Sequence, residues 1–226
     1  MPPDPVAGPA AAVEIAEEDR ARAECYALVS RLFYAPPDAA LLSALAAEAC
    51  APDDESSTTG AEARGSASGA DRTPPDFPTA FEGLRQACRD ADAGAVRQEY
   101  DDLFVAAGKA PVSPYTSGYT APSSPDRQLV ALREHLMQWG LARRDAAFEV
   151  EDHVSAICDV MRWLIEQDRP LSEQRRFFEA FVYTGLGAFC NAIDASPASS
   201  FYRAAAALAR AFGEVEREAF EMHLEE

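Results

Sequence analysis

The sequence has few of the residues that build metal sites and disulfide frameworks. Its 226 residues include five cysteines and three histidines, and neither a Cys-x-x-Cys nor a His-Glu-x-x-His spacing occurs. Because an odd number of singly scattered cysteines fits no complete disulfide framework, we interpret them as reduced core thiols. A metal site is not supported, and we expect the protein to use no cofactor.

Positive charge and long apolar runs are also scarce. The chain has 20 Lys and Arg against 38 Asp and Glu, a net charge of −18, which argues against nucleic-acid binding. No run approaches the roughly 18 apolar residues of a membrane span, and the N-terminus lacks the basic and apolar regions of a secretory signal. We therefore expect a cytoplasmic protein without integral membrane association. A cationic partner suits this charge, although acidic excess also favours solubility by itself.

Catalytic motifs are missing as well. There is no glycine-rich phosphate-binding loop, and no nucleophile elbow surrounds Ser113 or Ser117. Asp152 and His153 are neighbours in sequence, and neighbours on a helix do not face each other, so they do not form the base and orienting acid of a triad. We expect no enzymatic activity.

Helical periodicity dominates what remains. Tyr100, Leu103, Phe104 and Ala107, for example, fall at i, i+3, i+4 and i+7, and no β-type alternation occurs. With 48% hydrophobic residues, the sequence predicts an all-α, single-domain bundle of about eight to nine helices over residues 13–226. Residues 1–12 form a flexible tail in this interpretation. Residues 51–75, rich in Ser, Thr, Gly, Asp and Pro, form a disordered insertion, preferred over an interdomain linker because two preceding helices are too few for a core.

Several local predictions follow from capping residues and glycines. Asp38 caps the second helix, and Ser124 caps the helix that begins at Pro125. Gly185 and Gly187 indicate close packing of their helix against a neighbour. The C-terminal residues after Pro197 form two helices, one through Phe201, Leu208 and Phe212 and one over residues 215–224.

A proline-bounded aromatic loop follows the helix of residues 95–107. Pro111 and Pro114 cannot continue a helix, so residues 109–119 should be irregular. The loop carries Pro114, Tyr115, Ser117 and Tyr119, which offer flat apolar area, hydroxyl groups and close backbone approach. These residues suit the binding of an extended peptide, but the tyrosines could equally pack the loop onto the core.

Three motifs in this order resemble the TorD/DmsD/NarJ family, the dedicated chaperones of bacterial molybdoenzymes. The first joins Glu-Tyr-x-x-Leu-Phe at residues 99–104 to Pro-Tyr-x-Ser-x-Tyr at residues 114–119. The second is Asp152-His153 at the start of a long amphipathic helix, and the third is the aromatic pair Phe201-Tyr202. The chain departs from the family at Glu151, where a proline is usual, and at Ile157, where an acidic residue is common.

The resemblance implies a helical chaperone that binds the twin-arginine signal peptide and the apo catalytic subunit of one molybdoenzyme. In this hypothesis Asp152 takes the arginines and a groove covers the apolar stretch, and the protein is a monomer or a domain-swapped dimer. The alternative is an acidic helical adaptor that binds a folded partner without recognising signal peptides. The candidate peptide-binding residues are Asp152, His153, Tyr115, Ser117, Tyr119, Pro114, Leu103, Phe104 and Trp139.

Replacement of residues 53–73 by a short Gly-Ser bridge should leave the fold and partner binding almost unchanged, because loop length contributes only a logarithmic entropy term. Thermal melts of both proteins measure this. A fall in melting temperature of more than about 5 °C, on the order of 1 kcal/mol or more, would mean that the segment packs on the domain.

Overall fold

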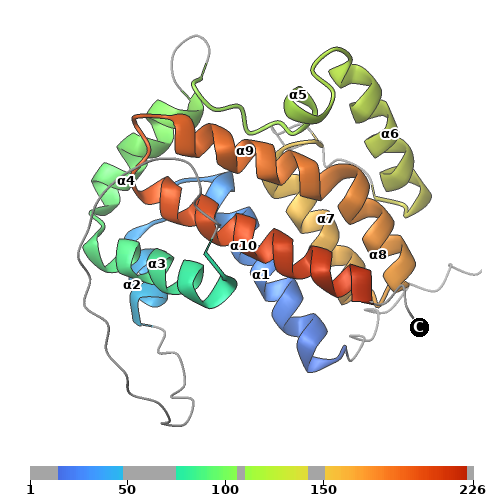
Figure 1. The fold of residues 1–226 in the computed structure, drawn as a ribbon, viewed down its shortest axis with the longest axis horizontal. Helices are drawn as coiled ribbons and strands as arrows, with labels where there is room; N and C mark the ends of the chain where they lie inside the picture. The colour runs from blue at the N-terminus through green and yellow to red at the C-terminus, as the bar shows by residue number, and fades with distance from the viewer. Residues whose placement is uncertain (1–14, 48–74, 106–109, 142–150, 223–226) are drawn as a thin grey trace, which may run out of the picture. The chain divides into compact units, whose positions relative to one another are not determined.

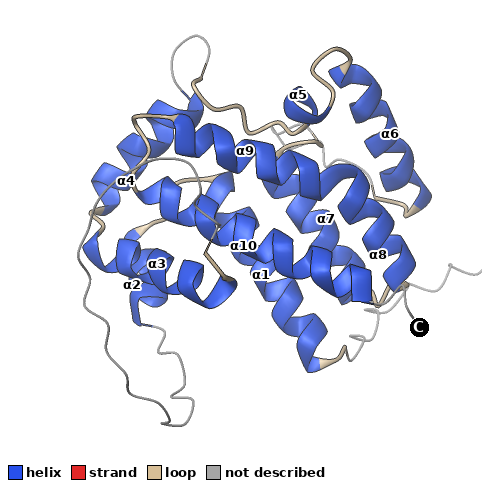
Figure 2. Cartoon of the chain, viewed as in Figure 1, coloured by secondary structure: helices blue, strands red, loops and turns tan. Residues whose placement is uncertain are grey.

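The computed structural model of the protein describes residues 15–47, 75–105, 110–141 and 151–222. Every regular element in these ranges is a helix, which confirms the predicted all-α class (Figure 2). Two of the helices contain a π-helical turn. Because α4 continues into η1, and α8 continues through η2 into α9, the described ranges form nine continuous helical segments, in agreement with the predicted number.

Figure 1 labels the α-helices, which follow one another along the chain together with the π-helical turns η1 and η2. Their bounds are α1 Glu17–Tyr34, α2 Ala39–Ala47, α3 Phe77–Asp90, α4 Ala93–Tyr100, η1 Asp101–Val105, α5 Ser117–Thr120, α6 Pro125–Gln138, α7 Val154–Glu166, α8 Leu171–Phe177, η2 Phe178–Val182, α9 Tyr183–Ala195 and α10 Phe201–Met222. None of the helices in the described ranges combines the length and apolarity needed to cross a membrane.

Aspartates begin three of these helices. Asp38 Oδ1 accepts a hydrogen bond from Leu41 N at 2.8 Å, which confirms the predicted cap of α2. Asp76 and Asp92 cap α3 and α4 in the same way. Hydrogen bonds from the Thr79 side chain and then from the Thr79 amide lower the pKa of Asp76, because they favour the charged carboxylate. Ser124 precedes Pro125 at the start of α6 as expected, but its side chain makes no cap hydrogen bond.

The prediction of two C-terminal helices was wrong, because α10 runs unbroken from Phe201 to Met222. The predicted break coincided with Gly213, which is buried inside the helix. A glycine in a helix costs only about 1 kcal/mol relative to alanine. The buried apolar face continues past it to Phe220, and burial of that face outweighs the cost.

The chain divides into two compact units, each built from separate stretches of sequence. Unit 1 comprises Met1–Ala35, Ser113–Phe189 and Arg217–Glu226, and unit 2 comprises Pro36–Val112 and Cys190–Glu216. The single-domain assignment therefore stays a prediction. The tail of residues 1–12 and nearly all of the insertion at 51–75 lie outside the described residues.

In unit 1, α1 packs along α7. Phe33 of α1 meets Phe189 of α9 edge-to-face, with ring centroids 4.9 Å apart. The guanidinium of Arg22 lies 5.4 Å from the ring centroid of Phe220, which also packs on Phe178. Aromatic contacts of this kind add to the area that the rings bury, so both ends of α1 are fixed in the core.

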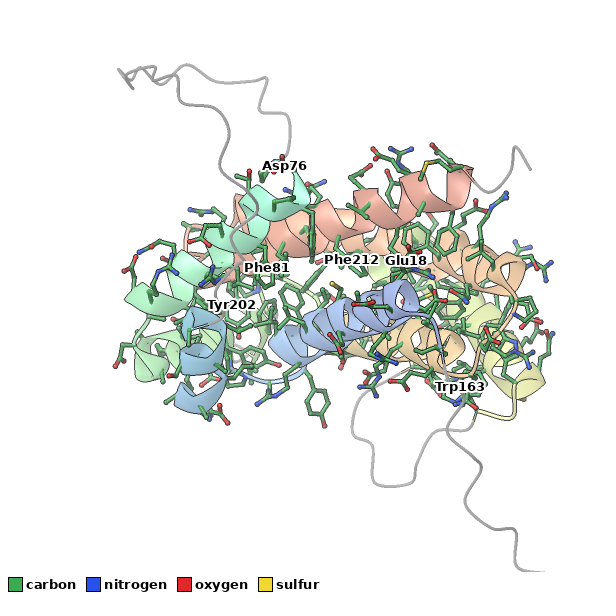
Figure 3. The ribbon with its side chains drawn as sticks, turned by 90° about the horizontal axis from the view of Figure 1, so that it is seen from below. Glu18, Asp76, Phe81, Trp163, Tyr202 and Phe212 are labelled. Atoms are coloured by element: carbon green, nitrogen blue, oxygen red, sulfur yellow. The ribbon has the colours of Figure 1, made fainter. Side chains whose placement is uncertain are left out.

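In unit 2, the fully buried Tyr202 forms the centre of an aromatic cluster (Figure 3). Its ring centroid lies 5.8 Å from that of Tyr100 and 5.2 Å from that of Phe104. Phe77 of α3 packs on Phe212 of α10 at 6.1 Å. These contacts place α3, α4 and η1 against α10.

Three of the five cysteines lie in the core as reduced thiols, as predicted: Cys88, Cys158 and Cys190. Burial raises the pKa of Cys88 to about 11 and that of Cys190 to about 12, because the apolar surroundings disfavour the thiolate. Both groups are therefore neutral and poorly nucleophilic near pH 7.

The two glycines of α9 differ in their surroundings. A Cβ built on Gly185 would lie 2.7 Å from Thr116 Cβ, whereas a Cβ on Gly187 would meet no atom within 4 Å. The predicted close packing is thus confirmed at Gly185 and wrong at Gly187. The close approach of α9 to Thr116 requires the absence of a side chain at position 185.

Gly185→Ala and Gly187→Ala form a matched pair on one helix with opposite expected effects. Gly185→Ala should destabilise the protein by about 1–3 kcal/mol, because Thr116 or α9 must shift. Gly187→Ala should stabilise it by up to about 1 kcal/mol through helix propensity. Urea unfolding measures both values, and equal effects would contradict the packing described here.

Candidate functional site

The aromatic loop is joined to the start of α7 by a short antiparallel backbone bridge between Tyr115 and His153. Thr116 N donates to Asp152 O at 3.0 Å, and Val154 N donates to Pro114 O at 2.9 Å. The bridge therefore satisfies a first-turn N–H of α7 with a loop carbonyl. It also brings two of the sequence motifs into direct contact.

The side chain of Asp152 anchors the same loop. Its Oδ2 accepts hydrogen bonds from Ser117 Oγ and, at 3.3 Å, from Ser117 N at the start of α5. Only 4% of Asp152 is exposed. Hydrogen bonds to an ionised carboxylate are stronger than neutral ones, so a buried acid in this position fixes the loop firmly.

His153 is the N-cap of α7. Its Nδ1 accepts a hydrogen bond from Ser155 N at 3.2 Å, so Nδ1 carries no proton. The ring meets that of Tyr115 edge-to-face at 5.6 Å and is 3% exposed. Asp152 and His153 are therefore both buried, although they stand at the start of a helix.

The remaining loop residues are held by their own hydrogen bonds. The Tyr119 hydroxyl donates to Ser113 O at 2.9 Å and accepts from Ser113 N at 3.2 Å. The loop was expected to be irregular up to Tyr119, but residues 117–120 form the helical turn α5, because Asp152 fixes its first residue. Pro114, Tyr115 and Tyr119 stay half-buried and form the accessible aromatic surface of the loop.

Leu103 and Phe104, also predicted as peptide-binding residues, belong to unit 2. Leu103 is fully buried, and Phe104 packs on Tyr100 and Tyr202. Their surroundings in that unit are those of core residues.

Glu99, the first residue of the same motif, has a role that the sequence analysis missed. Its two carboxylate oxygens accept hydrogen bonds from Ser200 N at 2.7 Å, Phe201 N at 3.0 Å and Tyr202 N at 2.8 Å. A carboxylate at this position satisfies the free N–H groups of α10 and interacts favourably with its dipole. No spacing or motif in the sequence connects Glu99 with the start of α10, because the bonded residues lie 101 to 103 positions further along the chain.

Trp139 lies apart from the loop. It packs on Trp163, near the end of α7, with ring centroids 6.4 Å apart. At 1.5 Å per residue, Trp163 is about 15 Å along α7 from His153. Six of the nine predicted residues therefore come together in unit 1, namely Pro114, Tyr115, Ser117, Tyr119, Asp152 and His153, and Trp139 does not join them.

Glu151, one of the departures from the family pattern, forms an ion pair with Arg133 of α6. The Arg133 Nη2 to Glu151 Oε2 distance is 3.1 Å, and a second hydrogen bond joins Nε to Oε1. The hydrogen bond to Glu151 raises the pKa of Arg133. The pair ties α6 to the residue that precedes Asp152.

Within the described residues, no group of three or more His, Cys, Asp or Glu is arranged to hold a metal ion.

Comparison with known proteins identifies the family of the chain. The family model of the nitrate reductase delta subunit matches residues 70–191, which is more than half of the chain. A crystal structure titled as a candidate redox enzyme maturation protein from Archaeoglobus fulgidus is similar, with 19% sequence identity and a TM-score of 0.48 over 87% of this chain and 93% of that one. Comparison with curated protein sequences gave no significant match.

The match to this family model defines a protein of the molybdoenzyme maturation chaperone class. The chain belongs to the nitrate reductase delta subunit family, which comprises the chaperones of NarJ and TorD type. The resemblance stated from the motifs is thereby confirmed.

Asp152→Asn should destabilise the protein by about 1–3 kcal/mol, because the charge that receives the Ser117 hydrogen bonds is lost from a buried position. Ser117→Ala should cost a similar amount, and the double variant should cost less than the sum, because both changes remove one interaction. Urea unfolding of the three variants measures this.

Asp159→Asn is the matched control on α7. Asp159 is exposed and makes only a 3.8 Å contact with Arg162, so its replacement should change stability by less than about 0.5 kcal/mol. If the losses of stability from Asp152→Asn and Ser117→Ala add up in the double variant, the two side chains act independently and the prediction is contradicted.

Proposed function

We propose that this protein is a cytoplasmic chaperone that binds the twin-arginine signal peptide and the apo catalytic subunit of one molybdoenzyme. In this proposal it holds the enzyme unexported while the molybdenum cofactor is inserted. The observation that carries the proposal is the match of more than half of the chain to the nitrate reductase delta subunit family.

The loop geometry supports a peptide-binding role for its accessible part. Pro114, Tyr115 and Tyr119 present half-buried apolar surface, and their backbone is fixed by the bridge to His153 and by the Asp152 carboxylate. A rigid aromatic surface loses little conformational entropy on binding, so it suits an apolar peptide segment. The contact of Asp152 with the arginines stays a prediction. Because Asp152, His153 and Ser117 are buried, in this proposal they contribute to the site by positioning the loop.

Charge supports the choice of a cationic peptide. The chain carries a net charge of −18, so the field around it attracts a segment that bears two arginines. The planar guanidinium of arginine can bind a carboxylate of the protein through two parallel hydrogen bonds, whereas the ammonium of lysine cannot. A twin-arginine segment should therefore bind more tightly than a twin-lysine segment. Binding and release of a peptide require no covalent step, so the proposed task needs no catalytic residue.

Affinity purification from the native host, followed by mass spectrometry, tests the proposed function. Recovery of a molybdopterin-containing catalytic subunit supports it. Recovery of an unrelated folded regulator, with no such subunit, would instead support an acidic helical adaptor and overturn the chaperone proposal.

A synthetic signal peptide of the captured enzyme should bind with micromolar or better affinity, and its Lys-Lys version should bind more weakly. Tyr115→Ala should weaken binding of the Arg-Arg peptide by about 1–3 kcal/mol, because it removes an aromatic anchor. Calorimetric titration in moderate salt measures these affinities, and thermal melts confirm that each variant is folded.

Tyr34→Ala is the control, since Tyr34 is a tyrosine of unit 1 that is 58% exposed and lies outside the loop. The affinity of the Tyr34→Ala variant for the peptide should equal that of the unmodified protein. Equal weakening by both tyrosine variants would remove the loop from the proposed site, and equal affinity for both peptides would leave only general acidity as the attraction.

A further inference from the structure

A second concave site lies in unit 1, away from the aromatic loop. It is a pocket of about 240 Å³ between the end of α6 and the start of α8. The residues that line it are His135, Gln138, Trp139, Arg169, Glu173 and Arg176. Nothing in the proposed signal-peptide site uses this pocket.

The charges of the pocket differ in sign from those of the whole protein. Two arginines and one glutamate line it, in a chain with a net charge of −18. Glu173 is already engaged, because Oε2 accepts hydrogen bonds from Arg169 Nη2 at 2.9 Å and from Trp139 Nε1 at 3.1 Å. Arg169 is thereby neutralised.

Arg176 is the cation that remains. It is exposed, and within the described part of the chain it forms no ion pair or side-chain hydrogen bond. A guanidinium that is not paired offers a planar set of N–H donors that matches a carboxylate or a phosphate. The Gln138 amide adds a further donor on the same rim.

The wall of the pocket is aromatic. Trp139 is half-buried, and Trp163 and Phe177 pack on it with ring centroids 6.4 Å and 5.6 Å from its own. The ring centroid of His135 lies 6.0 Å from that of Trp139. The indole is held in place by this packing and by its hydrogen bond to Glu173, so it can receive a flat apolar group without rearrangement.

We propose that this pocket binds a small organic anion, namely a carboxylate or phosphate carried on a flat apolar group. The flat group lies on Trp139, and the anionic group is bound by Arg176 and Gln138. Trp and Arg are also the residues that contribute most binding energy in protein interfaces, so the anion can belong to a free small molecule or to an acidic end of a protein partner.

Both tryptophans of the chain contact each other at this pocket, so intrinsic fluorescence reports on it directly. The Trp163→Phe variant leaves Trp139 as the single tryptophan, whose emission can be excited selectively over that of tyrosine. Phenyl phosphate and N-acetylphenylalanine, which has a free carboxylate, serve as probes, and the neutral N-acetylphenylalaninamide serves as their control. Both anions should change the fluorescence in a saturable manner, and the amide should not.

Arg176→Ala should weaken the binding of the anions about tenfold, the equivalent of one charge-assisted hydrogen bond. Arg127→Ala removes the same charge from an exposed position at the start of α6 and should leave the affinity unchanged. Arg176→Lys, which keeps the charge but not the planar group, should give an intermediate affinity.

The relative affinity of the two probes distinguishes the sources of the ligand. Tighter binding of phenyl phosphate indicates a phosphorylated small molecule, and tighter binding of N-acetylphenylalanine indicates an acidic end of a protein partner. The proposal is overturned if neither anion binds, if the amide binds as well as the anions, or if Arg176→Ala and Arg127→Ala have the same effect. None of these results depends on signal-peptide binding.

Discussion

The hydrogen bonds from Ser117 to the buried carboxylate of Asp152 hold together two segments that are 35 residues apart in the chain. Without them, α5 would lose the contact that fixes its first residue. The aromatic loop would then be tied to the start of α7 by the backbone bridge, the Thr116 hydroxyl and the contact of Tyr115 with His153. Unit 2 uses the same device, since Glu99 binds three amides at the start of α10. In both units a carboxylate satisfies backbone N–H groups that the fold would otherwise leave unpaired.

These contacts change the meaning of the family motifs. Glu99 caps a helix, Leu103 is fully buried, and Tyr100 and Phe104 pack on Tyr202. The first half of the motif therefore builds the scaffold of unit 2. In this chain, the proposed peptide recognition would fall to accessible groups such as the faces of Tyr115 and Tyr119.

The two departures from the family pattern fit this distinction. Ile157 is fully buried in α7, so an acidic side chain could not occupy its place without a buried partner. Glu151 pairs with Arg133 near the start of the same helix, which adds a link to α6 that a proline could not make. The residue at each position thus suits its surroundings in this chain: Ile157 lies in the apolar core, and Glu151 lies beside Arg133.

The sequence was sufficient for the features that depend on local physics. Helical periodicity predicted the all-α class, and the cap at Asp38 follows from the side-chain chemistry of one residue. The failures arose where distant residues decide the local structure. The turn α5 depends on Asp152, the open space beside Gly187 depends on which helices lie near α9, and the partner of Trp139 is a tryptophan on another helix. Spacing along one helix cannot show such contacts.

The order of the segments has a consequence for the synthesis of the protein. Unit 1 contains α1 together with the residues from Arg217 onward, and Arg22 lies against the ring of Phe220. A unit that draws on both early and late parts of a chain cannot reach its final packing while the ribosome is still translating the late part. The aromatic loop belongs to this unit, so the nascent chain should acquire its finished form only after nearly all of the helices have been made.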